Sequence, residues 1–202
     1  MNFTGAKVKK SRALGVALTP KAQRIMRKRP NPPGQHGEQG QKRRRRPSAY
    51  AVQLLEKQRL RFQYSVTEGY LRKTFELAGK STGATGEALV QLLETRLDAM
   101  VLRAGFAPTI YAARQYVTHG HFQLNGHKAT IPSMRLKIGD VITVRDRSKT
   151  MVMFNELKTT MPVAPYMVVD EAKMSARFDY LPTRYEIPVI CDEHLVVEFY
   201  SR

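Results

Sequence analysis

The densest cluster of chemically capable side chains lies in residues 119–128, HGHFQLNGHK, which hold three of the chain's five histidines. Three imidazoles in nine positions could bind a metal ion, exchange protons in catalysis, or donate hydrogen bonds to phosphate. A zinc site needs three or four converging ligands, and this stretch contains no cysteine or carboxylate to complete or support one. A general base needs an orienting partner, and neither paired carboxylates nor a nucleophile motif lies nearby. Two interpretations stay open: histidines that hydrogen-bond locally, and histidines that contact RNA phosphate or sugar.

Local signals distribute these histidines over different elements. Thr109 can cap a helix through residues 110–119, and Gly120 is placed as its left-handed C-terminal cap. The apolar period then changes to two, and Asn125-Gly126 between two short extended runs predicts a tight hairpin. The first histidine therefore ends a helix, the second opens a strand and the third follows the turn, so we expect no convergence of all three.

Capping residues and apolar spacing predict further helices before this module. Ser48 can cap a helix over 49–64, and Ser65 with Glu68 has the spacing of a capping box for a helix that Gly79 would close. The next predicted helix is continuous over residues 86–105. Its cap is Thr85, and its apolar residues recur at i, i+3 and i+4.

Extended segments are predicted after the hairpin. A turn at Gly139-Asp140 precedes an alternating strand over residues 141–144. Prolines interrupt the tail, in which short strands are predicted within YMVVD, SARFDYLP and HLVVEFYSR.

Net charge indicates the class of partner. The chain carries +17, with a pI near 10.2, which implies a polyanion such as nucleic acid or an acidic membrane. No run approaches the roughly 20 apolar residues that span a bilayer, and the first residues lack a secretory signal, so we expect no membrane partner and a cytoplasmic location. A single cysteine, Cys191, excludes an internal disulfide and a cysteine-cluster zinc site, and no cofactor motif is present.

The charge is unevenly distributed along the chain. Residues 1–46 hold 14 Lys and Arg against one acid, residues 47–150 hold 15 against 8, and residues 151–202 hold 5 against 8. The basic arm is rich in proline and glycine and is not expected to build a core by itself. It is interpreted either as a solvated basic tail or, as its short turn PPGQHG favours, as an extension that orders against phosphate backbone.

Over about residues 29–202, the chain resembles a known family, the fourth protein of the bacterial small ribosomal subunit. The segments that carry the resemblance are NPPGQHG, YAVQLLEKQRLRFQY, TGEALVQLLETRLD, TRLDAMVLRAGFA, ARQYVTHGHFQLNGHKATIPSMRLKIGDVITVRDRS and VVEFYSR.

The resemblance implies an α+β fold with a compact RNA-binding module from about Thr95 to Arg147. The expected organisation is a basic N-terminal extension (1–46), a helical domain (47–94), a helix-helix-hairpin module with a short twisted β-sheet (95–150), and a C-terminal segment (151–202) that packs back on the helical domain.

The resemblance also implies a function. Such a protein is a non-enzymatic constituent of the small (30S) subunit that binds the 5′ domain of 16S ribosomal RNA as a primary binder and nucleates assembly of the subunit body. It adjoins the fifth small-subunit protein, and with the fifth and twelfth proteins it influences translational accuracy. It lies near the path by which messenger RNA enters, where Arg43 to Arg46 match a basic stretch of relatives.

The chain departs from its relatives at two places. Many relatives carry four N-terminal cysteines that bind zinc, but residues 1–46 contain none, so no metal is expected. Relatives also tend to have basic residues early in the helix before HGH, where this chain has Ile110, Tyr111 and Ala112. Those three are not carried over as RNA contacts.

The predicted RNA-binding residues are basic, amide or imidazole side chains of the arm, the helical domain and the module. They are Arg24, Arg27, Lys28, Arg29, Gln35, His36, Arg43, Arg44, Arg45, Arg46, Lys57, Arg59, Arg61, Arg72, Lys73, Arg96, Arg114, Gln115, His119, His121, Asn125, Lys128, Arg135 and Lys137.

Two other classes of protein share some of these features. An RNA-modifying enzyme could carry the same module as an appendage, but the rest of the chain shows no catalytic signature. A DNA-binding protein would need a recognition helix with several base-reading side chains, and the helix after Thr109 offers only Arg114 and Gln115. DNA is therefore not an expected partner.

Overall fold

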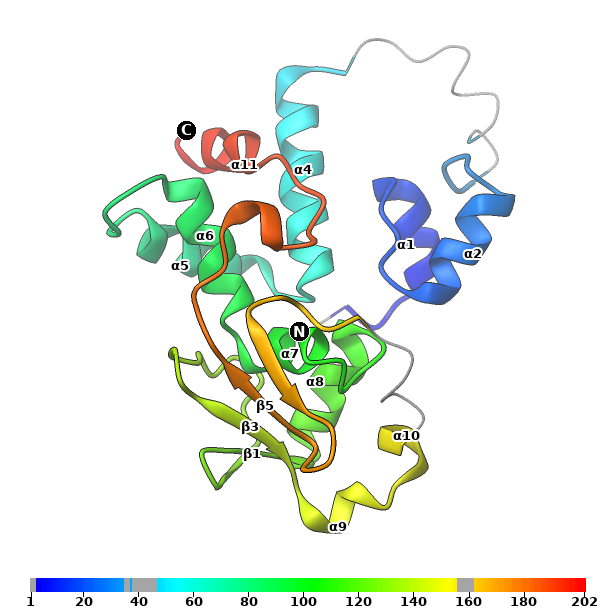
Figure 1. Cartoon of the computed structure of the whole chain (residues 1–202). Helices are drawn as coiled ribbons and strands as arrows, with labels where there is room; N and C mark the ends of the chain where they lie inside the picture. Colours follow the sequence, from blue (N-terminus) through cyan, green and yellow to red (C-terminus); the bar gives the residue numbers. More distant parts are fainter. Residues whose placement is uncertain (1–2, 35–36, 38–46, 156–161) are drawn as a thin grey trace. The chain divides into compact units, whose positions relative to one another are not determined.

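The chain forms two compact units in a computed structural model that describes residues 3–34, 37, 47–155 and 162–202 (Figure 1). The helical unit comprises Met1–Gly86 and Val189–Arg202, and the sheet unit comprises Glu87–Pro188. None of the helices in the described ranges is long and apolar enough to cross a membrane. Among the described residues there are ten α-helices and a five-stranded antiparallel sheet, which confirms the predicted α+β class.

Short helices make up most of the helical unit. Its described helices are α1 (Lys7–Leu14), α2 (Pro20–Lys28), α4 (Ala49–Gln63), α5 (Glu68–Ala78) and α11 (Glu193–Tyr200).

The first part of the predicted basic extension is folded. Thr19 caps α2 by accepting a hydrogen bond from the Ala22 amide at 3.1 Å, and Leu14, Val16 and Leu18 are buried. Arg59 of α4 donates to the Leu14 carbonyl at 2.8 Å. Because α1 also contacts α4, a segment too polar to fold alone is ordered here.

One predicted cap of the helical unit is confirmed and one is wrong. Ser48 accepts a hydrogen bond from the Ala51 amide and caps α4, as expected. Thr67, not Ser65, caps α5, because the Thr67 hydroxyl accepts from the Tyr70 amide at 3.3 Å. Ser65 instead is buried at a left-handed φ of 50° in the turn between the helices.

The predicted helix over residues 86–105 is interrupted and forms α6 (Thr85–Glu94) and α7 (Leu97–Arg103). Arg96 between them is extended and forms an antiparallel bridge with Arg135. The Leu97 amide donates to the Met134 carbonyl at 2.8 Å, so pairing with a distant segment replaces helical hydrogen bonds. The uninterrupted helix was therefore a wrong prediction.

The sheet has the order β2-β1-β3-β5-β4, and all its neighbours are antiparallel. Its strands are β1 (Phe122–Leu124), β2 (His127–Ala129), β3 (Val141–Val144), β4 (Met167–Asp170) and β5 (Ser175–Phe178). Asn125 and Gly126 have φ of 50° and 81° and join Leu124 to its partner His127, which confirms the predicted tight hairpin.

The tail differs from its prediction in two respects. HLVVEFYSR was predicted to contain a strand, but Glu193–Tyr200 is helical because Asp192 caps it and the helix packs on α4. Residues 151–188 belong to the sheet unit rather than the helical one, since β5 pairs with β3, as in Ile142 opposite Ala176. Only residues from Val189 onward lie in the helical unit. The remaining short elements are α9 (Asp146–Lys149), α10 (Val152–Asn155) and the 3-10 turn Arg184–Glu186.

One apolar core fixes α8 (Ile110–Thr118) relative to the hairpin. Val117 of α8, Phe122 of β1 and Ile142 of β3 are each completely buried in a cluster that also includes Met100 of α7. The cluster holds the end of α8 at the start of β1, where the two histidines of HGH lie.

Candidate nucleic-acid interface

The junction between α8 and β1 is a defined helix termination. The Gly120 amide donates to the Val117 carbonyl at 2.9 Å, and the His121 amide donates to the Tyr116 carbonyl at 3.1 Å. Gly120 has φ 74°, so this pair of bonds forms a Schellman motif. The prediction of Gly120 as a left-handed cap is confirmed.

Two of the three histidines lie close together at this junction. His119 is exposed at the end of α8, and its ring centroid is 6.1 Å from that of His121. His127 is exposed on β2 across the hairpin. The three histidines therefore belong to different elements, as expected, although His119 and His121 are neighbours. No group of three potential metal ligands occurs among the described residues.

His121 is held by contacts on several sides. Its Nδ1 lies 3.0 Å from the Ser148 hydroxyl of α9, and the Tyr116 and Phe154 rings lie edge-on. Burial lowers the pKa of His121, and the positive charges of His119, Arg147 and Arg145 lower it further. The imidazole is thus fixed in position and biased toward its neutral form.

Arg145 and Arg147 belong to this junction although neither was among the predicted RNA-binding residues. The Arg145 guanidinium donates to the Gly120 carbonyl at 3.2 Å, and its amide donates to the His121 carbonyl. The signal that could have found it is strand register, because Val144 lies opposite Phe122 and the next residue must lie beside His121.

The hairpin and the segment after it present exposed donors. Gln115 on α8, Lys128 on β2, and Arg135 and Lys137 on the connection are all exposed. Asn125 has another role: its Nδ2 donates to Asp140 at 2.8 Å and its Oδ1 accepts from the Val141 amide at 2.9 Å. The Asn125 side chain therefore stabilises the turn.

A buried carboxylate organises two predicted arginines. Asp98 is completely buried and accepts hydrogen bonds from both Nε and Nη2 of Arg96, whose side chain is 1% exposed. Arg114 of α8, 29% exposed, reaches the same carboxylate with Nη1 at 3.3 Å. Arg96 thus has an interior role, which corrects its prediction as an RNA contact, whereas Arg114 is oriented by Asp98 with part of its guanidinium at the surface.

Three predicted residues of α4 hold the helical unit together. Lys57 is buried, pairs with Glu68 at 2.9 Å and lies 4.4 Å from the centre of the Phe199 ring. Arg59 pairs with Glu56, and Arg61 donates to the Val66 carbonyl. Their cationic groups are used within the chain, which argues against direct RNA contact by Lys57 above all. Arg72 and Lys73, on α5, are exposed.

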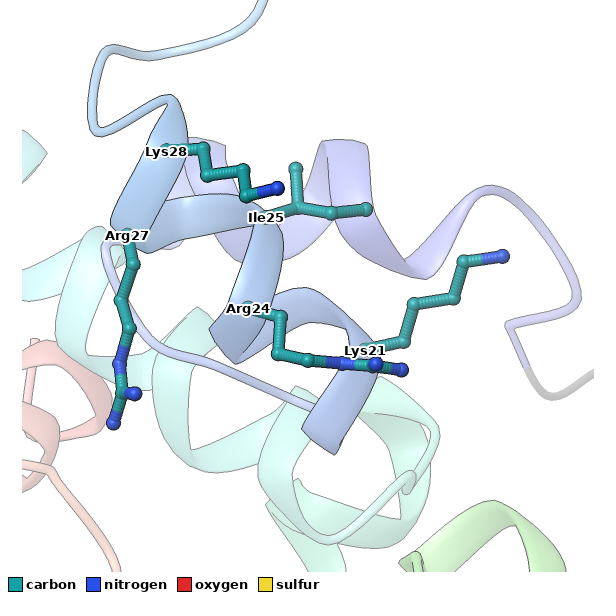
Figure 2. A pocket seen from close by; sticks show the side chains of 5 residues that line it. All are labelled: Lys21, Arg24, Ile25, Arg27 and Lys28. Atoms are coloured by element: carbon teal, nitrogen blue, oxygen red, sulfur yellow. The ribbon is translucent and has the colours of Figure 1, made fainter.

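The second basic surface lies on α2. Lys21, Arg24, Arg27 and Lys28 surround a hollow of about 480 Å³ that Ile25 also lines (Figure 2). All four basic side chains are exposed, Arg29 follows them at the end of the helix, and residues 3–34 contain no acid. Lys21 was not predicted; its spacing of three from Arg24 on one helix was the available signal.

Six predicted residues lie outside the described part of the chain. They are Gln35, His36, Arg43, Arg44, Arg45 and Arg46.

Comparison with known proteins identifies the two parts of the chain. Residues 2–94 match the family model described as the ribosomal protein S4/S9 N-terminal domain, and residues 95–142 match the S4 domain. Together these matches cover most of the chain. The segment before the RNA-binding module matches a ribosomal-protein domain and not a catalytic domain.

Curated relatives match over nearly their whole length. The small ribosomal subunit protein uS4 of Streptomyces avermitilis is 52% identical over 207 aligned positions, covering 100% of this chain and 99% of the relative. That of Streptomyces coelicolor is 52% identical and covers 97% of each, and that of Micrococcus luteus is 50% identical, covering 96% of this chain and 95% of the relative. The chain therefore belongs to the uS4 family of small ribosomal subunit proteins, a family of structural proteins with an S4 RNA-binding domain rather than of enzymes.

Proposed function

We propose that this chain is a primary binder of the 5′ domain of 16S ribosomal RNA that nucleates assembly of the small-subunit body. The supporting observation is the set of exposed donors around one rigid helix-to-hairpin junction: Gln115, His119, Lys128, Arg135 and Lys137. Double-stranded RNA is recognised mainly through shape and phosphate contacts, and such a surface fits that mode of binding.

The basic face of α2 supports a second contact with the same RNA. Its four exposed cations have no acidic neighbour in residues 3–34, so close packing of that face requires counter-charge from outside the chain. Phosphate neutralisation supplies most of the affinity, and the fit of the junction supplies selectivity.

The proposal is tested by binding a 5′-domain fragment of 16S RNA at several salt concentrations. Lys128→Gln and, separately, Arg114→Gln should each weaken binding and reduce the salt slope by about one unit per lost phosphate contact. Lys173→Gln is the matched control, since Lys173 is an exposed lysine of the sheet unit that pairs with Asp170 between β4 and β5. Slopes for both variants equal to that of the parent would exclude this surface.

Competition with duplex DNA separates this function from DNA binding. A structured 5′-domain RNA should displace the chain from DNA of equal length and charge, and a preference for DNA would overturn the proposal. In cell extract the chain should sediment with the small subunit.

Protein neighbours and the accuracy role extend the proposal. The tail from residue 151 has three more acids than bases, which suits contact with a basic protein such as the fifth small-subunit protein. With the fifth and twelfth proteins the chain would influence translational accuracy, and Arg43 to Arg46 would approach messenger RNA. The accuracy role and the contact with messenger RNA can be tested together. The test compares misreading by ribosomes that carry both Arg43→Gln and Arg44→Gln with misreading by parental ribosomes.

A further inference from the structure

The α8–β1 junction brings four ionisable side chains into one place. His119 comes from the end of α8, His121 from the start of β1, Arg145 from the end of β3, and Arg147 from α9. The two imidazole centroids are 6.1 Å apart. The Arg145 guanidinium donates a hydrogen bond to the carbonyl of Gly120, the residue between the two histidines. Two permanent cations therefore lie beside two side chains that can gain a proton.

His121 is the better fixed of the two imidazoles. The Ser148 hydroxyl lies 3.0 Å from Nδ1 of His121. The rings of Tyr116, Phe154 and His119 lie around the imidazole and restrict its rotation. A ring held in this way keeps one nitrogen in a constant direction, whichever protonation state it has. Such an arrangement can recognise a ligand atom at a fixed point.

The charged groups that act on His121 from its neighbours are all cationic. They are His119 of α8, Arg145 after β3 and Arg147 of α9. The other two charged residues of α9, Asp146 and Lys149, pair with each other at 2.7 Å, and the remaining contacts are the neutral Tyr116, Phe154 and Ser148. In the free protein, a proton on His121 is therefore opposed by like charge as well as by burial.

We propose that this junction is a phosphodiester site at which ribosomal RNA binds together with a proton on His121, so that affinity for RNA rises as pH falls. The proposal rests on the proposed RNA-binding function and adds Arg145 and Arg147 to its contacts. It assigns the histidines a role that a permanently charged side chain could not fill.

The direction of the pH effect follows from the change in surroundings on binding. A phosphate supplies the negative charge that the free junction lacks, so the pKa of His121 is higher in the complex than in the free protein. The complex then holds more protons than the free chain at pH values between the two pKa values. Affinity is highest below the pKa of the free protein and is lost as pH rises through the pKa of the complex.

The size of the effect can be stated as a fold-change. An opposite charge within about 4–6 Å raises the pKa of a base by about 1–3, and each unit corresponds to a tenfold change in affinity. Between about pH 8 and about pH 5.5 the dissociation constant for a 5′-domain fragment of 16S RNA should therefore fall several-fold, approaching about tenfold, for a shift of one unit, and should fall further for a larger shift. The limiting slope is one proton per bound RNA, because one imidazole gains a proton on binding.

The experiment measures binding of the full chain to that fragment across this pH range at constant ionic strength. His121→Gln should bind more weakly than the parent at about pH 5.5 and should lose most of the pH dependence, whereas His127→Gln, at an exposed histidine across the hairpin, should behave like the parent. Arg145→Gln should weaken binding at every pH, because it removes a permanent cation.

A second measurement keeps the test independent of the variant's folding. Nuclear magnetic resonance of the parental chain, with labelled histidines, gives the pKa of His121 with and without RNA. An increase on binding supports the proposal, and an unchanged value overturns it. Equal pH dependence in parent and His121→Gln also overturns it while leaving RNA binding intact, whereas no binding at any pH would reject the proposed function itself.

Discussion

At the scale of single residues, Asp98 illustrates how one buried carboxylate supports a surface. It accepts hydrogen bonds from Arg96 and Arg114 and from the Ala99 amide at 3.0 Å. Arg96 is almost completely buried, so its charge depends on this partner. The same carboxylate that keeps Arg96 inside also orients Arg114, for which we propose a contact with RNA.

Asp98→Asn should strongly destabilise the sheet unit. The substitution removes the charge of Asp98 from beside the buried Arg96 guanidinium, and breaking a buried ion pair typically costs about 3–5 kcal/mol. Urea unfolding followed by circular dichroism measures the change in the free energy of unfolding. Asp146→Asn is the control, because the Asp146 side chain is 96% exposed and its loss should leave stability almost unchanged. Similar stabilities for the two variants would contradict the role given to Asp98.

Glu68 gives the helical unit a dependence on pH. Burial raises its pKa, but hydrogen bonds from Lys57 and Tyr200 outweigh burial, and the pKa lies below its ordinary value of 4.5. A lowered pKa stabilises the folded state above the unfolded pKa, and this contribution is lost as pH falls through the folded pKa.

Glu68→Gln should therefore lower the thermal midpoint at pH 7, and the gap from the parent should narrow as pH falls below about 4.5, the ordinary value. Thermal unfolding of both proteins from neutral to acidic pH measures this difference in thermal midpoint. Glu76→Gln serves as a control, since the Glu76–Arg72 pair on α5 is well exposed. A gap that stays constant down to acidic pH would contradict the predicted linkage.

At the scale of elements, two glycines have similar open space beside them but different backbone conformations. An added Cβ would meet nothing within 4 Å at either Gly69, in α5, or Gly126, in the hairpin. Gly126 has φ 81°, a left-handed conformation, whereas no such φ occurs at the helical Gly69. The two sites therefore isolate backbone conformation from packing.

Gly126→Ala should destabilise the chain by about 1–2 kcal/mol, because a side chain disfavours the left-handed region. Gly69→Ala should stabilise it by up to about 1 kcal/mol, because alanine loses less entropy in a helix. Denaturant midpoints of the two variants and the parent give both signs in one series. Changes in the same direction would contradict the assigned backbone conformations.

At the scale of the whole molecule, the net charge of +17 makes salt act in two opposite ways. Like charges destabilise the free folded chain, and added salt screens them. The same salt weakens RNA binding, because binding releases counterions from the phosphates.

Raising salt from about 50 to about 200 mM should therefore increase the thermal midpoint of the free chain and decrease its affinity for RNA. Scanning calorimetry and filter binding measure the two quantities in the same buffers. The stabilisation should level off by about 300 mM, where the screening length is short, which distinguishes screening from a general salt effect on burial. A midpoint that falls with salt would show that self-repulsion is not significant.

Much of the helix-to-hairpin junction followed from signals within a few residues. Thr109 and Gly120 bound α8, Asn125-Gly126 forms the turn, and Ser48 caps α4, each as predicted. Caps and tight turns depend on a side chain or a backbone angle and on amides close by in sequence, so sequence suffices to recognise them.

Other features could not be predicted because they depend on partners far away in the chain. The break at Arg96 requires pairing with Arg135, and the burial of Lys57 requires Glu68 together with the ring of Phe199. The helix in the tail replaces a predicted strand because it packs on α4.

The sequence by itself determined that the chain is a basic, α+β protein with a helix-to-hairpin module and an affinity for polyanions, since charge and local pattern are properties of the chain alone. Only the tertiary structure decided which cations remain at the surface and which are neutralised inside. It also placed Arg145 and Arg147 beside His119 and His121, because strand register, rather than sequence distance, brings residue 145 next to residue 121.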